Sequence, residues 1–184
     1  PWEIYEVSGS QLVVGLDHEP AVWSNVRDNF HSWGNPAMTW YLDPTQWDVP
    51  MAATGDPSWK KVKFPAKADT RAIEPATATK VRATQDSISF DVDQIGKPML
   101  VKTSFFPNWE ASGAKGPYRV TPNLMVVVPT ERHVTLTYGR TPVELGSMGL
   151  SALGLLLLLL LLRRPEPDPL PIHDWIGDRD DLPR

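Results

Sequence analysis

Cysteine is absent from this 184-residue sequence, which excludes a disulfide framework, a thiolate nucleophile and a cysteine-liganded metal site. The four histidines are far apart and show no HExxH or similar spacing, so we expect no metal site. They are His18, His31, His133 and His173. Basic residues are not in excess either: the net charge is −4, and Lys and Arg are scattered. This pattern argues against a nucleic-acid partner.

Motifs of catalysis are also missing. The sequence has no nucleophile elbow, no Gly-rich phosphate loop and no Ser/His/Asp arrangement with a favourable spacing. Asp17-His18-Glu19 places acid–base groups side by side, but a helix start before Pro20 is the more ordinary role of such residues. The residues therefore identify no active site and indicate no cofactor, and they leave open whether the chain belongs to an enzyme.

Apolar residues are concentrated in one long run. Leu145 to Leu162 carries no charge and ends in eight consecutive leucines, directly before Arg163-Arg164. As a helix it would span roughly 27 Å, close to the ~30 Å hydrocarbon core of a bilayer. A buried core helix is the alternative, but a domain of this size could hardly cover eight leucines on every side. We therefore predict a transmembrane helix at residues 143–162, with the lipid bilayer as a partner and the cell membrane as the location.

The charges that flank this run predict its orientation. Arg163-Arg164 follows the run and Glu144 precedes it, which favours a cytoplasmic C-terminal side and places residues 1–142 outside the cytoplasm. Residues 163–184, rich in acids and proline, are expected to be a disordered cytoplasmic tail. Because Pro1-Trp2-Glu3-Ile4 contains no signal, we expect the chain to be the C-terminal piece of a longer protein whose N-terminal membrane region is missing.

Before this helix, short alternating segments predict β-structure. Ile88, Phe90 and Val92 alternate with polar residues, as do residues 134–138, which is typical of strands with one buried face. The 19 prolines favour strands and loops over long helices. Turn signals separate six such candidates, and their spacing predicts an antiparallel β-sandwich at residues 79–142. The candidates are residues 79–84, 87–92, 99–106, 118–121, 124–128 and 134–138.

Residues 1–78 predict a mixed segment. One or two strands are expected between Trp2 and Val14, and another at residues 59–64. Apolar residues at intervals of three to four from Ala21 predict a helix that ends at Gly34. A second short helix is expected to begin at Asn35-Pro36, which gives a helical insertion at about residues 20–42.

Aromatic residues and carboxylates cluster within this segment, which has a composition suited to sugar recognition. Aromatic faces stack on the apolar faces of sugar rings, and carboxylates accept hydroxyl protons. A small core or an interfacial aromatic belt would explain the same tryptophans. The candidate carbohydrate contacts are Trp33, Trp40, Tyr41, Asp43, Trp47, Asp48 and Trp59.

Phe105-Phe106-Pro107-Asn108-Trp109-Glu110 combines an apolar strand end with a tryptophan and a carboxylate, and its simplest interpretation is a strand whose Trp covers the sandwich edge. A longer pattern is formed by this motif, the strands at residues 118–120 and 123–129, and His133-Val134-Thr135-Leu136-Thr137-Tyr138 before a closing helix. It resembles the C-terminal region of large bacterial polytopic membrane proteins. These are the YfhO-like group and the actinobacterial proteins labelled as 6-pyruvoyl-tetrahydropterin-synthase-related, similar in turn to C-superfamily membrane glycosyltransferases.

The resemblance is clearest over residues 98–162. It implies an extracytoplasmic accessory domain and membrane anchor of a cell-envelope glycosyltransferase-like protein, in contact with a glycan or a lipid-linked sugar. The catalytic residues of such enzymes are expected in loops between earlier helices, so none is assigned here. The alternative is a purely structural β-sandwich that contacts no substrate.

Overall fold

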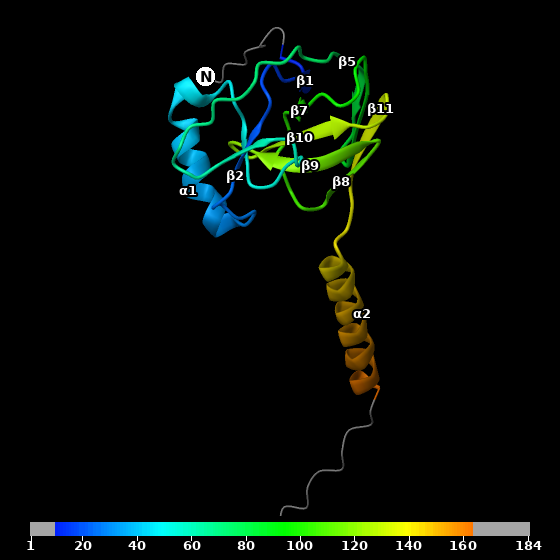
Figure 1. Ribbon diagram of the computed structural model, residues 1–184. Coiled ribbons are helices and arrows are strands. Elements are labelled where there is room, and N and C mark those ends of the chain that lie inside the picture. Colours follow the sequence, from blue (N-terminus) through cyan, green and yellow to red (C-terminus); the bar gives the residue numbers. More distant parts are fainter. Residues whose placement is uncertain (1–9, 164–184) are drawn as a thin grey trace, which may run out of the picture. The chain divides into compact units, whose positions relative to one another are not determined.

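Two β-sheets form the framework of the described chain, which comprises residues 10–163 of this computed structural model (Figure 1). The predicted tail beyond Arg163 and the part of the predicted first strand before Ser10 lie outside the described residues. The chain divides into two compact units between Arg140 and Thr141. In chain order the elements of the first unit are β1 (Val13–Gly15), β2 (Ala21–Trp23), α1 (Phe30–Tyr41), the short 3-10 helix η1 (Pro44–Gln46), β3 (Met51–Ala52), β4 (Lys60–Val62), β5 (Ala78–Ala83), β6 (Ser87–Val92), β7 (Met99–Val101), β8 (Trp109–Ser112), β9 (Ala114–Val120), β10 (Leu124–Pro129) and β11 (His133–Tyr138).

The larger sheet has the strand order β1-β7-β10-β9-β3-β2-β4, and the smaller has the order β5-β6-β11-β8. Neighbouring strands are antiparallel except around β2, which runs parallel to both β3 and β4. The predicted mainly β fold with two sheets is thus confirmed, and its antiparallel pairing holds outside β2. Strands from the predicted mixed segment and from the predicted sandwich region share the larger sheet.

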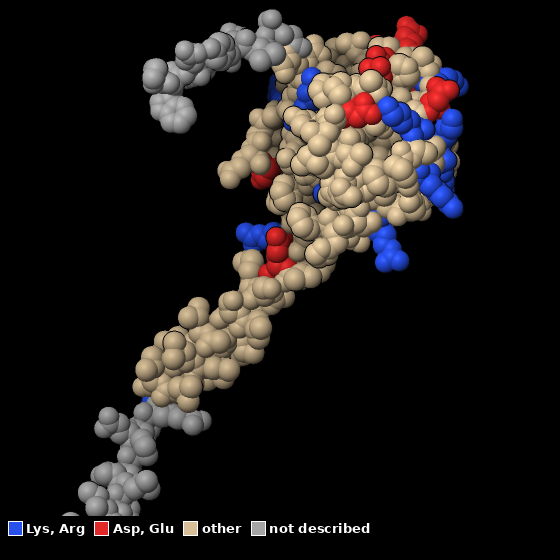
Figure 2. All heavy atoms as spheres, turned by 90° about the vertical axis from the view of Figure 1, so that its left-hand side faces the viewer, with Lys and Arg blue, Asp and Glu red and all other residues tan. Residues whose placement is uncertain are grey.

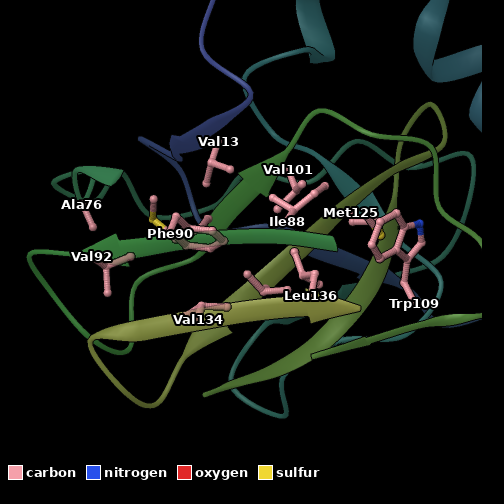
Figure 3. Close-up of a cluster of buried hydrophobic side chains, with 12 residues drawn as sticks. Val13, Ala76, Ile88, Phe90, Val92, Val101, Trp109, Met125, Val134 and Leu136 are labelled. Atoms are coloured by element: carbon pink, nitrogen blue, oxygen red, sulfur yellow. The ribbon is translucent and has the colours of Figure 1, made fainter. Parts of the chain in front are cut away.

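The two sheets pack on each other through alternating side chains (Figure 3). Ile88, Phe90 and Val92 of β6 point inward, as the sequence alternation predicts. They meet Met125 and Val127, the inward positions of β10. The whole cluster is Val13, Ala76, Ile88, Phe90, Val92, Met99, Val101, Trp109, Met125, Val127, Val134 and Leu136. Trp109 is buried in it, so the tryptophan of the 105–110 motif is part of the core.

Helix α1 covers the other part of the larger sheet, next to β2 and β3. Ala21 and Trp23 share a cluster with Trp33, Ala37 and other residues of α1, whereas Val22 belongs to a cluster with Ala52 and Val120 on the opposite face. β2 is therefore buried on both faces, which explains why its sequence shows no apolar/polar alternation.

The predicted helix from Ala21 to Gly34 is wrong in its position. Residues 21–23 form a buried strand, and α1 begins only at Phe30, where Asn29 caps it by accepting a hydrogen bond from the Ser32 backbone N–H. α1 then continues through Gly34 and Pro36, where a break between two helices was expected. Proline interrupts helical hydrogen bonding, but one buried face that includes Trp33, Ala37 and Trp40 keeps the segment in a single helix.

A turn was expected between the candidate strands at residues 99–106 and 118–121, but β8 and β9 meet in this interval with only Gly113 between them. At Gly113 the chain passes from the smaller sheet to the larger one, with a φ of +74°. A Cβ at this position would lie 2.2 Å from the backbone oxygen of His133. Glycine thus permits a direct step between sheets where a longer turn was expected.

The second unit is α2 (Pro142–Leu162), which confirms the predicted apolar helix. Its first turn is a capping box: the Thr141 hydroxyl accepts from the Glu144 N–H, and the Glu144 carboxylate accepts from the Thr141 N–H. Leucines surround the helix axis along its second half, so that part has no polar face. By length and composition, α2 can cross a membrane.

Candidate functional site

An apolar groove runs along α1. Its volume is about 790 Å³, within the range of roughly 300–1,000 Å³ that is usual for small-molecule sites. Figure 2 turns the α1 side of the domain to the viewer: charged side chains lie mostly in the upper and right-hand parts of this face, and a broad area below them consists of other residues. The groove is lined by Asp28, Asn29, Phe30, Trp33, Gly34, Ala37, Met38, Tyr41, Phe105, Phe106, Pro107, Arg119, Pro122 and Asn123.

One wall of the groove is a stripe of α1. Phe30, Met38 and Tyr41 recur at helical spacing, with Gly34 between the first two, so they lie on the same side of the helix. Their exposed fractions are 81%, 57% and 52%. Large apolar side chains with this exposure mark a surface that a ligand or partner can cover.

The opposite wall comes from the segment between β7 and β8, where Phe105, Phe106 and Pro107 lie. Arg119 of β9 pairs with Met125 of β10, so their side chains lie on the same face of the larger sheet. From this face Arg119 lines the groove. Its guanidinium lies 4.9 Å from the centre of the Trp33 ring and 5.8 Å from that of Phe105, which are cation–π distances.

Arg119 is held in place but keeps spare donors. Its Nε–H donates to Asn123 Oδ1 at 2.8 Å, and Nη1 lies 3.4 Å from Asp28 Oδ1. No further hydrogen-bond partner of this guanidinium exists among residues 10–163. Its side chain is only 15% exposed, so its charge acts in a partly desolvated setting, where electrostatic attraction is stronger than in water.

A second, polar pocket of about 240 Å³ lies beside η1. The hydroxyl of Thr70 is buried there and has no hydrogen-bond partner within the described chain. The neighbouring Asp43 carboxylate accepts from Lys67, Thr45 and Gln46, and the Lys67 contact, the strongest, holds the pKa of Asp43 well below its usual range. The pocket is lined by His18, Thr45, Gln46, Asp48, Val49, Met51, Lys67, Ala68, Asp69 and Thr70.

Three of the predicted carbohydrate-contact residues are buried tryptophans. The Trp33 indole N–H donates to the Pro122 backbone oxygen at 3.0 Å, and that of Trp40 donates to Val49 at 3.1 Å. Trp59 packs edge-on against Tyr118 on the far face of the larger sheet. These rings hold the domain together, and Trp33 also lines the groove.

The other four predicted contacts gather near η1. Tyr41 and Trp47 stack with their ring centres 6.1 Å apart, and the Trp47 ring is about half exposed. Asp43 caps η1, and the exposed Asp48 lines the polar pocket. The structure thus brings two accessible rings and two carboxylates together. The prediction of sugar contact at these residues stays a prediction.

A further polar cluster lies on the smaller sheet, where the Asp91 carboxylate is 2.7 Å from His133 Nδ1 and 2.8 Å from Lys80 Nζ. Within residues 10–163 no group of three or more His, Cys, Asp or Glu side chains is placed to hold a metal ion. His18 Nδ1 lies 3.2 Å from the neighbouring Asp17 carboxylate, and Arg71 pairs with Glu19 at 2.7 Å. The groove and the polar pocket are two candidate binding sites of the described chain.

The sequence analysis missed the groove. Its walls come from three segments far apart in the chain, and their approach depends on sheet order. A usable signal was present in Phe30, which interrupts an otherwise polar stretch at residues 27–32. A second was Arg119, whose position on β9 alternates with the apolar Val120.

No protein-family model, curated protein or solved structure matches this chain.

Proposed function

We propose that this chain is a membrane-anchored, extracytoplasmic binding domain, an accessory part of a cell-envelope glycosyltransferase-like membrane protein. In this proposal α2 crosses the bilayer, and the β-sandwich unit holds a glycan or lipid-linked sugar near the membrane surface. The observation that carries the sugar contact is the accessible ring pair of Tyr41 and Trp47, which is adjacent in sequence to Asp48, a residue that lines the polar pocket.

The chemistry of this region suits a sugar. The half-exposed Trp47 indole offers an apolar face to ring C–H groups, and the polar pocket lined by Gln46, Asp48 and Thr70 supplies amide, carboxylate and hydroxyl partners. The buried Thr70 hydroxyl supports this proposal, because a polar atom without a partner gains most from a ligand hydroxyl. Membrane anchoring is supported by the charge-free leucine run of α2.

Saturation-transfer NMR on the full chain in nanodiscs, with fragments of envelope glycans, tests the sugar contact. We expect transfer to sugar protons in the wild type, and binding at least about tenfold weaker in Trp47→Ala and Asp48→Asn. Both side chains are exposed, so these variants keep the fold. The matched controls are Val81→Ala and Asp86→Asn on the smaller sheet. Absence of transfer from every glycan would remove the sugar contact from the proposal.

A purely structural sandwich is the second candidate, and the burial of Trp33, Trp40 and Trp59 favours it. In that case the exposed Tyr41–Trp47 pair would contact another part of the same membrane protein. Chemical cross-linking from position 47 separates the two: a protein adduct without glycan binding supports the structural role.

A further inference from the structure

We infer that the groove along α1 binds a phospholipid with a phosphoethanolamine head group, with the phosphate on Arg119 and the ammonium on Asp28. The inference rests on the proposed membrane anchoring as its source of lipid; it shares Tyr41 with the proposed sugar contact but uses neither Trp47 nor Asp48.

The apolar walls fit a lipid chain. Phe30, Met38 and Tyr41 form a continuous exposed stripe on one side, and Phe105 and Phe106 lie on the other. Apart from Asp28 and Arg119, no lining residue carries a charge at neutral pH. An acyl chain loses contact with water along such a groove, whose walls are mainly apolar.

The two charges in the groove fit a zwitterion better than a simple anion. Arg119 offers planar, bidentate donors that match a phosphate. Asp28 lies 3.4 Å from it and cancels its charge, so an anionic ligand alone would face the Asp28 carboxylate. A phosphoethanolamine group places an N–H-donating ammonium near its phosphate and satisfies both side chains. A choline group lacks N–H donors and cannot satisfy Asp28 in this way.

The geometry and the covalent structure favour lipid over a peptide. β9 and β10 are internal strands, so the groove floor offers no free strand edge to an extended peptide.

Only Gly139, Arg140 and Thr141 separate β11 from α2. Such a short link keeps the domain close to any bilayer that α2 enters, and the local lipid concentration is correspondingly high.

Native mass spectrometry of the full chain in detergent, with dioleoyl phosphatidylethanolamine, phosphatidylcholine or phosphatidylglycerol added, tests the inference. For the wild type we expect one phosphatidylethanolamine site about tenfold tighter than the sites for the other two lipids. Arg119→Gln should weaken this site about tenfold. Asp28→Asn should abolish the preference over phosphatidylglycerol, because Arg119 then attracts an anion without opposition.

A second variant, Met38→Gln, changes an exposed residue and serves as the test if Arg119→Gln unfolds the domain. It should weaken the binding of all three lipids at this site. Arg132→Gln and Asp86→Asn, remote from the groove, are the matched controls and should bind as the wild type does. Unchanged binding in Met38→Gln, or a preference for phosphatidylglycerol in the wild type, would overturn the inference. Loss of a dimer in Met38→Gln would overturn it too, in favour of a second copy of the chain. Asp48→Asn, which tests sugar contact, leaves lipid binding unchanged.

Discussion

Asp56 and Lys115 form an ion pair that connects the loop before β4 to β9. Lys115 Nζ lies 2.8 Å from Asp56 Oδ2, while Asp56 Oδ1 accepts from the N–H and hydroxyl of Ser58. These contacts, led by that of Lys115, lower the pKa of Asp56 to about 2 from 3.8. Asp56 raises the pKa of Lys115 in return. The same loop positions Trp59, which covers the far face of the larger sheet.

This shift predicts a pH-dependent stability. The carboxyl binds protons less readily in the folded protein than in the unfolded chain, so the stabilisation from Asp56 is fully present above pH 3.8 and is lost as pH falls to about 2. We expect Asp56→Asn to lower the Tm at pH 7, and the difference from wild type to vanish near pH 2. Thermal unfolding followed by circular dichroism measures both, with Asp86→Asn as control. A Tm difference that persists unchanged at pH 2 would contradict the prediction.

Single residues also show what the sequence could not tell about the candidate site. Trp40 and Tyr41 are neighbours on α1, yet Trp40 is buried and Tyr41 is exposed, because successive helical residues point about 100° apart. Composition could group the aromatic residues with Asp43 and Asp48. Which rings reach solvent depends on the orientation of α1 over β2, and that orientation comes from packing.

At the scale of elements, α1 is the helix whose N-terminus is at the groove. Asn29 Oδ1 accepts from the Ser32 N–H at 2.9 Å, and the Ser32 hydroxyl accepts from the Arg27 N–H at 2.8 Å. α1 has Gly34 and Pro36 inside it and no charged pairs to support it, so its first turn depends on this cap.

We therefore expect Asn29→Ala to destabilise the β-sandwich unit by about 1 kcal/mol. The corresponding drop in Tm is about 4 °C for a unit of this size. Asn29→Asp retains an acceptor and should remain within about 0.5 kcal/mol of wild type. Thermal unfolding of the full chain in nanodiscs provides the measurement. Equal losses of stability in both variants would contradict this prediction, because they would show that Asn29 stabilises the unit through its amide group and not as a helix cap.

Element prediction succeeded where a local pattern decides the structure. The alternation in β6 and β11 predicted both strands and their inward faces, since each has one side against the core. It failed at β2, a three-residue strand buried on both faces between β3 and β4. The helical spacing of apolar residues that predicted a helix there came from Trp23, Val26 and Trp33. These residues lie in a strand, a loop and a helix, and their side chains share one core.

For the whole molecule, α2 and its flanking charges predict the orientation in the membrane. Arg163-Arg164 at one end favours the cytoplasm for that end. The chain contains no cysteine, so single-cysteine variants each carry one thiol. We expect a membrane-impermeant maleimide to label Arg82→Cys in intact cells and Asp180→Cys only after lysis. Labelling of Asp180→Cys alone in intact cells would show the opposite orientation.

The sequence predicted the apolar helix and the mainly β unit, but neither the groove nor the pocket. The groove combines residues 28–41 with residues 105–107 and 119–123. These segments meet because β9 has β10 on one side and β3 on the other, with β2 beyond β3. No local pattern encodes this strand order, so the site had to come from the three-dimensional structure.

The position of β11 has a mechanical consequence. β11 leads into α2 through three residues, and it is an internal strand, paired over five residues with β6 and over four with β8. Tension that reaches this unit through α2 is thus applied to a strand with a hydrogen-bonded neighbour on each side, and both ladders must yield before it detaches. An edge strand in this place would peel away after the loss of a single ladder. The chain attaches α2 at a point where the fold resists pulling.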